Sequence, residues 1–384
     1  MKPLSEIVKK APKSKIRKLF DMAAGRSDVI SLGIGQPDFP SPQSLIDGTI
    51  DALQTRKTVY APTRGVPELR DLVAKKARNE NGIEAAGPEN VIISNGGSQA
   101  ITLAMAILFN PGDELILSSP NFVSYFYCSQ FFQAKAVEIR RNEDMSPNFD
   151  EYRKRITPKT KAILVCSPNN PSGYTYTRDE WEELADIVIE NDLYLISDEV
   201  YEKFVYDDRE ALSPASLESM AERTITLNAI SKTFAAPGFR LGYVIADTEK
   251  INLMEKYMQY TVAGVNHPAQ YGAISAMKAS QDFFEPIKKD YVKRRDFVYK
   301  RLKEIGFKVA RPNGSFYIMP SIDAFNLSAD DFAMQLMKEK AVAVVPGDIF
   351  GSYSSSQVRI SYAVEMEKLE EAMNRIESFT SSIK

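Results

Sequence analysis

The chain has 384 residues, and its 48 Lys and Arg residues nearly balance its 51 Asp and Glu residues, leaving a formal net charge of -3. This length exceeds what one hydrophobic core usually supports, so it predicts a large domain with a smaller companion. The near balance of charge argues against nucleic acid as a partner.

Cysteine usage and hydropathy indicate the cellular location of the protein. Its two cysteines, Cys128 and Cys166, are far apart and form no CxxC pair, so the sequence predicts neither a disulfide framework nor a zinc site. No apolar run approaches the roughly 18 residues needed to cross a bilayer, and the N-terminal residues lack the apolar core of a signal peptide. We therefore expect a soluble, cytoplasmic protein with no membrane partner.

Short apolar runs alternate with segments of helical period from about residue 90 to residue 245. Such alternation predicts an α/β fold with a mainly parallel sheet covered by helices. A helix between two of the strands opens with Thr177 and Glu180 at the spacing of a capping box. The clearest predicted strands are residues 91–94, 114–117, 162–166, 194–196, 224–227 and 242–246.

The two ends of the chain are predicted to pack together. Residues 271–306 have a helical pattern rich in Lys and Arg, and short strand-like runs follow them at 315–319, 342–345 and 358–361. A strand at 30–34 has no partner nearby in the sequence. We therefore expect a large domain of residues 46–280 and a small α+β domain made of residues 1–45 and 281–384.

Open parallel sheets bind ligands at the carboxyl ends of their strands, where four polar segments occur in this sequence. The first is residues 95–99, Asn-Gly-Gly-Ser-Gln, whose glycines and following helix suit a phosphate. Alone this signal is weak, because glycine is common in strand-to-helix turns. The second is residues 167–173, where two prolines fix the backbone and place the Asn170 amide at the strand end; an ordinary Asn-Pro turn also explains it.

The third and fourth segments supply a carboxylate and an amine. Asp198 follows an apolar strand, where a buried carboxylate requires a cation. A metal is not predicted, because His267 is the only histidine and no cluster has ligand spacing. Lys232 also follows an apolar strand, and desolvation there would make it a nucleophilic free amine. A lone lysine at such a position is more often a solvated loop charge.

These segments occur in a specific combination. The run from Ser231 to Phe234 reads Ser-Lys-Thr-Phe, with Arg240 eight residues after the lysine, and residues 170–173 and 198–201 read Asn-Pro-Ser-Gly and Asp-Glu-Val-Tyr. In this order and spacing the sequence resembles the aminotransferases of fold type I that depend on pyridoxal 5'-phosphate (PLP), classes I and II of the aspartate aminotransferase superfamily. The resemblance spans nearly the whole chain and is strongest to archaeal and bacterial aspartate and aromatic aminotransferases. It implies a three-layer αβα large domain, with PLP as the cofactor.

The resemblance also implies roles for single residues. Lys232 would carry PLP as a Schiff base and move protons, and Asp198 would pair with the pyridine nitrogen so that the ring acts as an electron sink. Asn170 and Tyr201 would hydrogen-bond the ring hydroxyl oxygen, and Phe122 would stack on the ring. Lys232, Asp198 and Tyr201 form the predicted catalytic set.

Further cofactor contacts follow from the same resemblance. Gly97, Ser98 and Arg240 would hold the phosphate, and Ser231 completes the cofactor set on this chain. Tyr60 would reach over from the partner subunit, which implies a homodimer with shared active sites.

The implied substrates are an amino acid and a 2-oxo acid such as 2-oxoglutarate. Arg359 would grip the substrate α-carboxylate with its two-pronged guanidinium, assisted by Asn170 and by a backbone N–H of Gly35. The reaction would run in two halves, with Lys232 removing the α-proton and returning it to the cofactor. The same residues would also serve a carbon-sulfur β-lyase, or an aminotransferase of alanine or broad specificity.

The side-chain specificity stays open in the sequence. Arg17 and Arg64 are candidates to bind a distal substrate carboxylate, with surface ion pairs as the alternative. We interpret His267 as structural, because the mechanism requires no imidazole. An aromatic substrate pocket or ordinary core packing would equally explain Tyr125, Phe126 and Tyr127.

Overall fold

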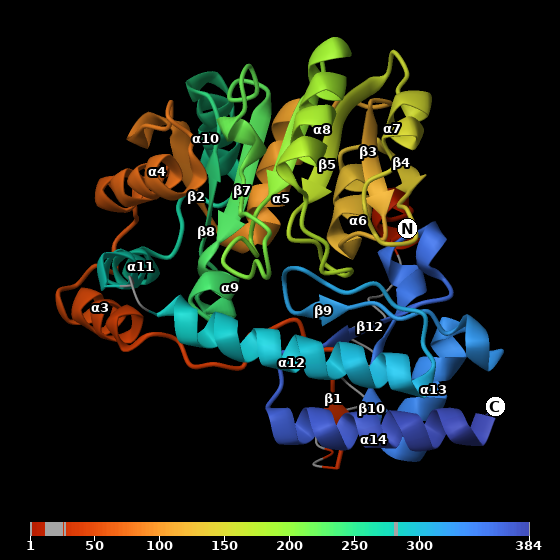
Figure 1. The fold of residues 1–384 in the computed structure, drawn as a ribbon. Helices are drawn as coiled ribbons and strands as arrows, with labels where there is room; N and C mark the ends of the chain where they lie inside the picture. Colours follow the sequence, from red (N-terminus) through yellow and green to blue (C-terminus); the bar gives the residue numbers. More distant parts are fainter. Residues whose placement is uncertain (1, 12–25, 27, 280–282, 384) are drawn as a thin grey trace.

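A computed structural model describes residues 2–11, 26, 28–279 and 283–383. The large sheet and its helices occupy one half of the molecule, and the long helix α12 (Phe284–Ile305) runs along their lower side in Figure 1. The C-terminal helix α14 (Met366–Ile383) lies on the other side of α12 in this view. Among the described helices, none is long and apolar enough to span a membrane.

A seven-stranded sheet with the order β2-β8-β7-β6-β5-β3-β4 forms the centre of the large half. Only β8 runs antiparallel to its neighbours β2 and β7, so the sheet is mainly parallel and the predicted α/β class is confirmed. The strands are β2 (Val91–Ser94), β3 (Glu114–Ser119), β4 (Lys135–Arg140), β5 (Thr160–Cys166), β6 (Tyr194–Asp198), β7 (Thr224–Ala229) and β8 (Gly242–Ile245).

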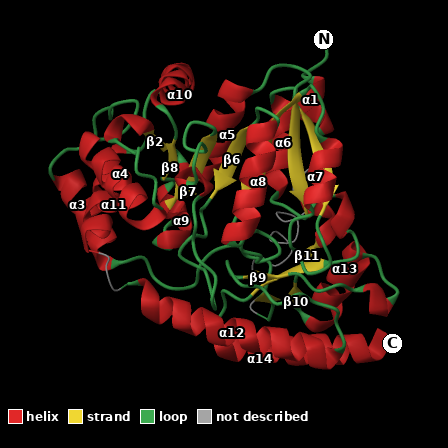
Figure 2. Ribbon diagram, turned by 45° about the horizontal axis from the view of Figure 1, so that its top comes forward, coloured by secondary structure: helices red, strands yellow, loops and turns green. Residues whose placement is uncertain are grey.

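Both faces of this sheet are buried, which explains its continuous apolar strands. Along β5, Leu164 belongs to one hydrophobic cluster, whereas its neighbours Ile163 and Val165 belong to the cluster on the opposite face, as the two-residue repeat of a strand requires. Helices cover both faces (Figure 2). They are α4 (Pro67–Asn81), α5 (Gly96–Leu108), α6 (Val123–Phe131), α7 (Phe149–Arg155), α8 (Arg178–Glu190) and α10 (Thr248–Thr261).

The N-terminal segment joins the C-terminal part through β1 (Ile30–Ser31), which pairs in parallel with β10 (Val342–Ala343). The isolated strand expected at 30–34 led us to expect packing of this segment with the C-terminal part; the strand itself ends at Ser31. A second small sheet has the order β11-β12-β9. The remaining elements here are β9 (Tyr317–Ile318), β11 (Val345–Pro346), β12 (Val358–Ser361) and α13 (Ala329–Lys340). Because the N-terminal segment pairs with the C-terminal part, we propose a large domain of residues 46–280 and a small domain made of residues 1–45 and 281–384.

The helical pattern at 271–306 belongs to two helices. Helix α11 (His267–Ala279) packs along α3 (Gln43–Gln54), and α12 begins only at Phe284. The sequence predicted one connecting helix over this range, but only α12 has that role. The residues up to Ala279 form α11, which packs against α3. Two short helices, α1 (Glu6–Lys10) and α9 (Ile230–Thr233), complete the described set of α-helices.

Helix α8 begins with the predicted capping box. The Thr177 hydroxyl accepts the Glu180 backbone N–H at 3.2 Å, and the Glu180 carboxylate accepts the Thr177 backbone N–H at 2.8 Å. We expect Thr177→Ala to lower the free energy of unfolding by about 1 kcal/mol, because a helix-end N–H loses its acceptor. Urea unfolding measures this change. Thr177→Ser keeps the hydroxyl and should stay near wild type; an equal loss in both variants would contradict the capping role.

Candidate active site

A cavity of about 270 Å³ opens at the carboxyl ends of β5, β6 and β7. It brings together all the site residues predicted on this chain, although they are spread over more than 300 positions of the sequence. Tyr60 is the exception; it is 91% exposed and does not line the cavity. The predicted residues in the cavity wall are Gly35, Gly97, Ser98, Phe122, Asn170, Asp198, Tyr201, Ser231, Lys232, Arg240 and Arg359.

Asp198 is the last residue of β6, and its side chain is buried. The Tyr125 hydroxyl donates to its carboxylate at 2.7 Å, and the Val200 backbone N–H donates at 3.2 Å. Burial raises the pKa of Asp198, while the hydrogen bond from Tyr125 acts in the opposite direction and favours the ionised form. The carboxylate therefore depends on its donors to keep its charge.

Lys232 lies on the single-turn helix α9, where it is half-buried. Its amine donates to the backbone carbonyl of Gly35. Burial, and after it the positive charges of Arg359 and Arg240, together lower the pKa of Lys232 to about 8. A usable fraction of the side chain is thus a free amine near neutral pH, which a solvated lysine would not provide.

Arg359 is a buried cation on β12 with no acidic partner in the described part of the chain. Its guanidinium donates to the Asn170 side-chain oxygen at 2.9 Å and to the Gly33 carbonyl at 2.7 Å. Its Nε has no hydrogen-bond acceptor among the described residues, and its centre lies 4.5 Å from the Tyr317 ring centroid. A buried guanidinium held only by neutral groups is suited to an anionic ligand.

Asn170 and two tyrosines form a hydrogen-bonded chain in the cavity wall. The Asn170 amide donates to the Tyr201 hydroxyl at 3.3 Å, and the Tyr201 and Tyr317 hydroxyls lie 3.0 Å apart. A Cβ on Gly35 would lie 2.5 Å from the Tyr317 hydroxyl, so a larger residue there would have to displace this hydroxyl. In this structure Gly35 contributes its carbonyl, to Lys232, whereas the sequence reasoning expected a contribution from its N–H.

The start of helix α5 and Arg240 form a cationic cradle. Gly96 opens the helix with a positive φ of 72°, and a Cβ there would lie 2.7 Å from the Arg240 guanidinium. A Cβ on Gly242 would lie within 3.0 Å of the backbone of Gly96 and Gly97. The guanidinium therefore approaches the free N–H groups of a helix start, which is a suitable environment for a phosphate.

Sequence reasoning missed Tyr125 as the partner of Asp198 and did not assign Tyr317. Tyr125 follows Phe122 by three residues, one turn of helix, which gives a weak signal that both line one wall. Tyr317 lies on a two-residue strand from the far end of the chain, and no local pattern marks it.

Of the two arginines considered for a distal carboxylate, Arg64 does not line the cavity of this chain. The Arg64 guanidinium donates to Glu255 at 2.6 Å, and Arg17 lies outside the described residues. His267 places Nδ1 3.1 Å from the Val59 carbonyl and does not line the cavity. The described residues contain no group of three or more His, Cys, Asp or Glu side chains that could hold a metal ion.

Comparison with known proteins places this constellation in a family. Residues 27–376 match the family model of aminotransferase class I and II. The chain belongs to the class I and II aminotransferases. It is 43% identical to an aspartate aminotransferase of Pyrococcus abyssi, over 95% of each chain, and 41% identical to aromatic-amino-acid aminotransferase 2 of Thermococcus litoralis, over 97% of each chain.

Solved structures agree with the family. The aromatic aminotransferase of Pyrococcus horikoshii is 41% identical, with a TM-score of 0.90 over 96% of this chain and 99% of the other. The chain is thus an aminotransferase of amino acids with the type I fold, and aminotransferases of this family use PLP.

The lowered pKa of Lys232 predicts an unusual pH dependence of its reactivity. Without PLP, labelling of Lys232 by an amine-reactive reagent should rise to half its maximum near pH 8, because only the neutral amine is nucleophilic. Mass spectrometry of digests labelled between pH 6.5 and 9.5 measures this, with exposed Lys289 in the same digest as the reference. A Lys232 profile without an inflection between pH 7 and 9 would refute the lowered pKa.

Proposed function

We propose that this aminotransferase transfers the α-amino group of aspartate or an aromatic amino acid to a 2-oxo acid such as 2-oxoglutarate, with PLP bound at Lys232. One observation carries the proposal. The half-buried amine of Lys232, the buried carboxylate of Asp198 and the buried guanidinium of Arg359 line one cavity. Aspartate and the aromatic amino acids are proposed as substrates because they appear in the names of the relatives from Pyrococcus and Thermococcus.

The residues present fit PLP. Arg240 and the α5 start, with Gly97 and Ser98, form a cradle for the phosphate, which a side chain at Gly96 would fill. Asp198 is a buried carboxylate that needs a cation, which a protonated pyridine nitrogen supplies. Asn170 and Tyr201 would hold the ring hydroxyl, and Phe122 would stack on the ring face. Ser231 of this chain and Tyr60 of the partner subunit would complete the set. When bound, PLP supplies an electron sink for the negative charge that develops at the substrate α-carbon.

The chain's own residues then have separate tasks. Arg359 binds the substrate α-carboxylate and fixes the orientation of the α-carbon relative to the Lys232 amine. The lowered pKa of Lys232 lets its Nζ accept the α-proton near neutral pH and donate it again. Tyr125 keeps Asp198 ionised by donating to the carboxylate. A β-lyase is the second candidate, since these tasks do not fix what happens after proton removal.

We propose a homodimer because two adjacent large apolar side chains are exposed at Tyr60. Val59 is 67% exposed and Tyr60 91%, and such side chains together suit an interaction surface. A second copy covering this surface would bring Tyr60 to the partner's cavity. We also propose the cytoplasm as its location, from the two free cysteines Cys128 and Cys166.

The amine of Lys232 can be tested directly. Purified protein with PLP should show a visible absorbance band that shifts to shorter wavelength when aspartate, phenylalanine or tyrosine is added without any oxo acid. Lys232→Ala should lose turnover by a factor of at least about 1000, because it lacks the covalent anchor and the proton carrier. Near-normal turnover in Lys232→Ala would refute the assignment, and release of a thiol, pyruvate and ammonia from an S-substituted cysteine without any oxo acid would indicate the lyase.

Removing the Tyr125 hydroxyl tests how Asp198 is kept charged. Tyr125→Phe should weaken PLP binding at equilibrium by about tenfold, because the carboxylate loses a hydrogen bond that favours its ionised form. Fluorescence titration of the protein with PLP measures this constant. Tyr174→Phe is the matched control, since the Tyr174 hydroxyl donates to Glu180 away from the cavity. Equal PLP affinity in Tyr125→Phe and wild type would contradict this role.

A further inference from the structure

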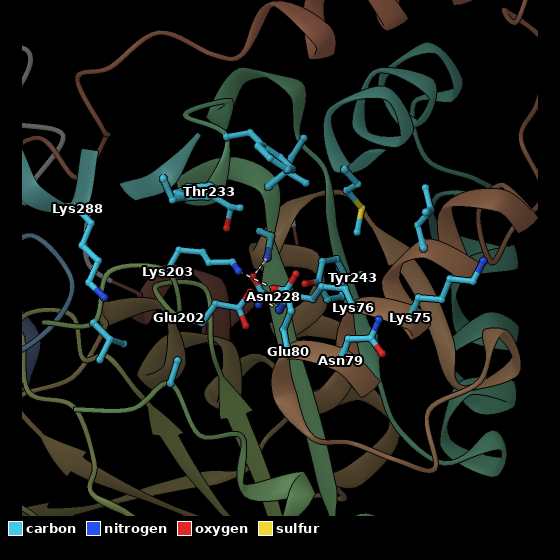
Figure 3. A pocket seen from close by; sticks show the side chains of 18 of the residues that line it. Lys75, Lys76, Asn79, Glu80, Glu202, Lys203, Asn228, Thr233, Tyr243 and Lys288 are labelled. Atoms are coloured by element: carbon cyan, nitrogen blue, oxygen red, sulfur yellow. Dashed lines mark hydrogen bonds and ion pairs between the residues drawn. The ribbon is translucent and has the colours of Figure 1, made fainter. Parts of the chain in front are cut away.

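A second cavity, of about 490 Å³, lies behind the chain segment that carries Lys232. Its volume falls within the range of about 300–1,000 Å³ that is typical of small-molecule sites. Residues Asn228 to Ile230 and Thr233 form one wall, and Ala229 lines both this cavity and the active site. Helix α4, the turn at 202–205 and the facing ends of α11 and α12 form the other walls (Figure 3). We call this second cavity the rear pocket.

The acidic groups of the rear pocket are largely neutralised. Glu202 is buried, pairs with Lys76 and accepts the Asn81 amide at 2.8 Å. Glu80 pairs with Lys203 at 2.6 Å. Five basic and three acidic side chains line the pocket, so its net charge is positive: Lys75, Lys76, Lys203, Arg209 and Lys288 against Glu80, Glu202 and Glu285.

Several hydrogen-bond donors of the wall have no acceptor. The Asn228 side-chain oxygen accepts the Ala229 backbone N–H at 2.7 Å, but no described residue accepts from its amide nitrogen. The Thr233 and Tyr243 hydroxyls also have no hydrogen-bond partner among the described residues, and burial raises the pKa of Tyr243, so its hydroxyl keeps its proton. In Figure 3, Asn228, Thr233 and the amine of Lys203 point toward the same part of the pocket.

These donors adjoin an apolar region. Ile230, Phe234, Met277 and Phe284 line the pocket, and the Lys203 amine lies 5.9 Å from the Phe284 ring centroid. The net positive charge of the lining and these neutral donors suit a single carboxylate, which would share the Lys203 amine with Glu80. A dianion is disfavoured, because the Lys76 amine is paired with Glu202 and offers no second free charge.

We propose that the rear pocket binds a small monocarboxylic acid with an apolar or aromatic group. The carboxylate contacts Lys203, Asn228 and Thr233, and the apolar group packs on Ile230 and Phe284. Binding there is coupled to cofactor binding, because Thr233 and Ile230 belong to the same four-residue helix as Lys232. A ligand on one side of this helix favours one position of the amine on its other side, and such coupling is reciprocal. Only this coupling rests on the proposed role of Lys232.

The binding site is tested with 3-phenylpropionate on PLP-saturated protein that carries Arg359→Gln, which removes carboxylate capture in the active site. Calorimetry should show saturable binding. Adding Lys203→Gln should weaken that binding by about tenfold, because the ligand loses a charge-assisted hydrogen bond, and adding Thr233→Val should weaken it less. Lys289→Gln is the control, since Lys289 is exposed on helix α12 and lies outside the pocket. No saturable binding, or binding that both pocket substitutions leave unchanged, would overturn the site.

The coupling has its own measurement. The equilibrium constant for PLP binding to the same Arg359→Gln protein should change about fivefold or more in either direction when 3-phenylpropionate saturates the rear pocket. An unchanged constant would overturn the coupling while the site itself stands. Failure of this protein to bind PLP at all would count against the proposed role of Lys232, not against the pocket, because calorimetry then reads 3-phenylpropionate binding on the same protein without PLP.

Discussion

The site depends on placing a carboxylate and an amine at one apolar edge of a buried sheet. Asp198 ends β6, and Lys232 follows the adjacent strand β7 in a single turn of helix. Burial acts on both groups against their charged forms. The amine is consequently reactive, whereas the carboxylate keeps its charge only through donors such as the Tyr125 hydroxyl. The donors to Asp198 in the cavity wall offset part of the cost of burying its charge.

Residues from both ends of the chain complete the cavity at the edge of the sheet. Arg359 comes from the small sheet, yet it donates to Asn170 after β5 and to the Gly33 carbonyl near β1. The Gly35 carbonyl in turn accepts the Lys232 amine. Three distant segments therefore meet through hydrogen bonds to polar groups that would otherwise be buried without partners. The parallel pairing of β1 with β10 fixes the N-terminal segment in the position that these contacts require.

The sequence predicted those parts of the structure that depend on local pattern. Strand β2 has the predicted bounds, and β3, β5, β6 and β7 extend the predicted runs by a few residues, because continuous apolar runs mark strands buried on both faces. Strand β4 was missed, since this edge strand, Lys135–Arg140, carries charged residues and is only partly buried. Tyr125 and Tyr317 were not assigned, because their roles arise from contacts across 73 and 116 positions of the chain.

The charges of the cavity connect binding with reactivity. Three cations, Lys232, Arg240 and Arg359, line it with one acid, Asp198, although the whole chain has a net charge of -3. A locally positive cavity attracts phosphate and carboxylate groups. The same two guanidinium groups also lower the pKa of Lys232, so the charges that would hold anionic ligands are among those that free its amine. When anions neutralise these guanidinium groups, the pKa of Lys232 should rise, and the amine then gains affinity for the proton that we propose it removes from the substrate. Binding of the anionic ligands would thus strengthen the base at the moment when it is needed.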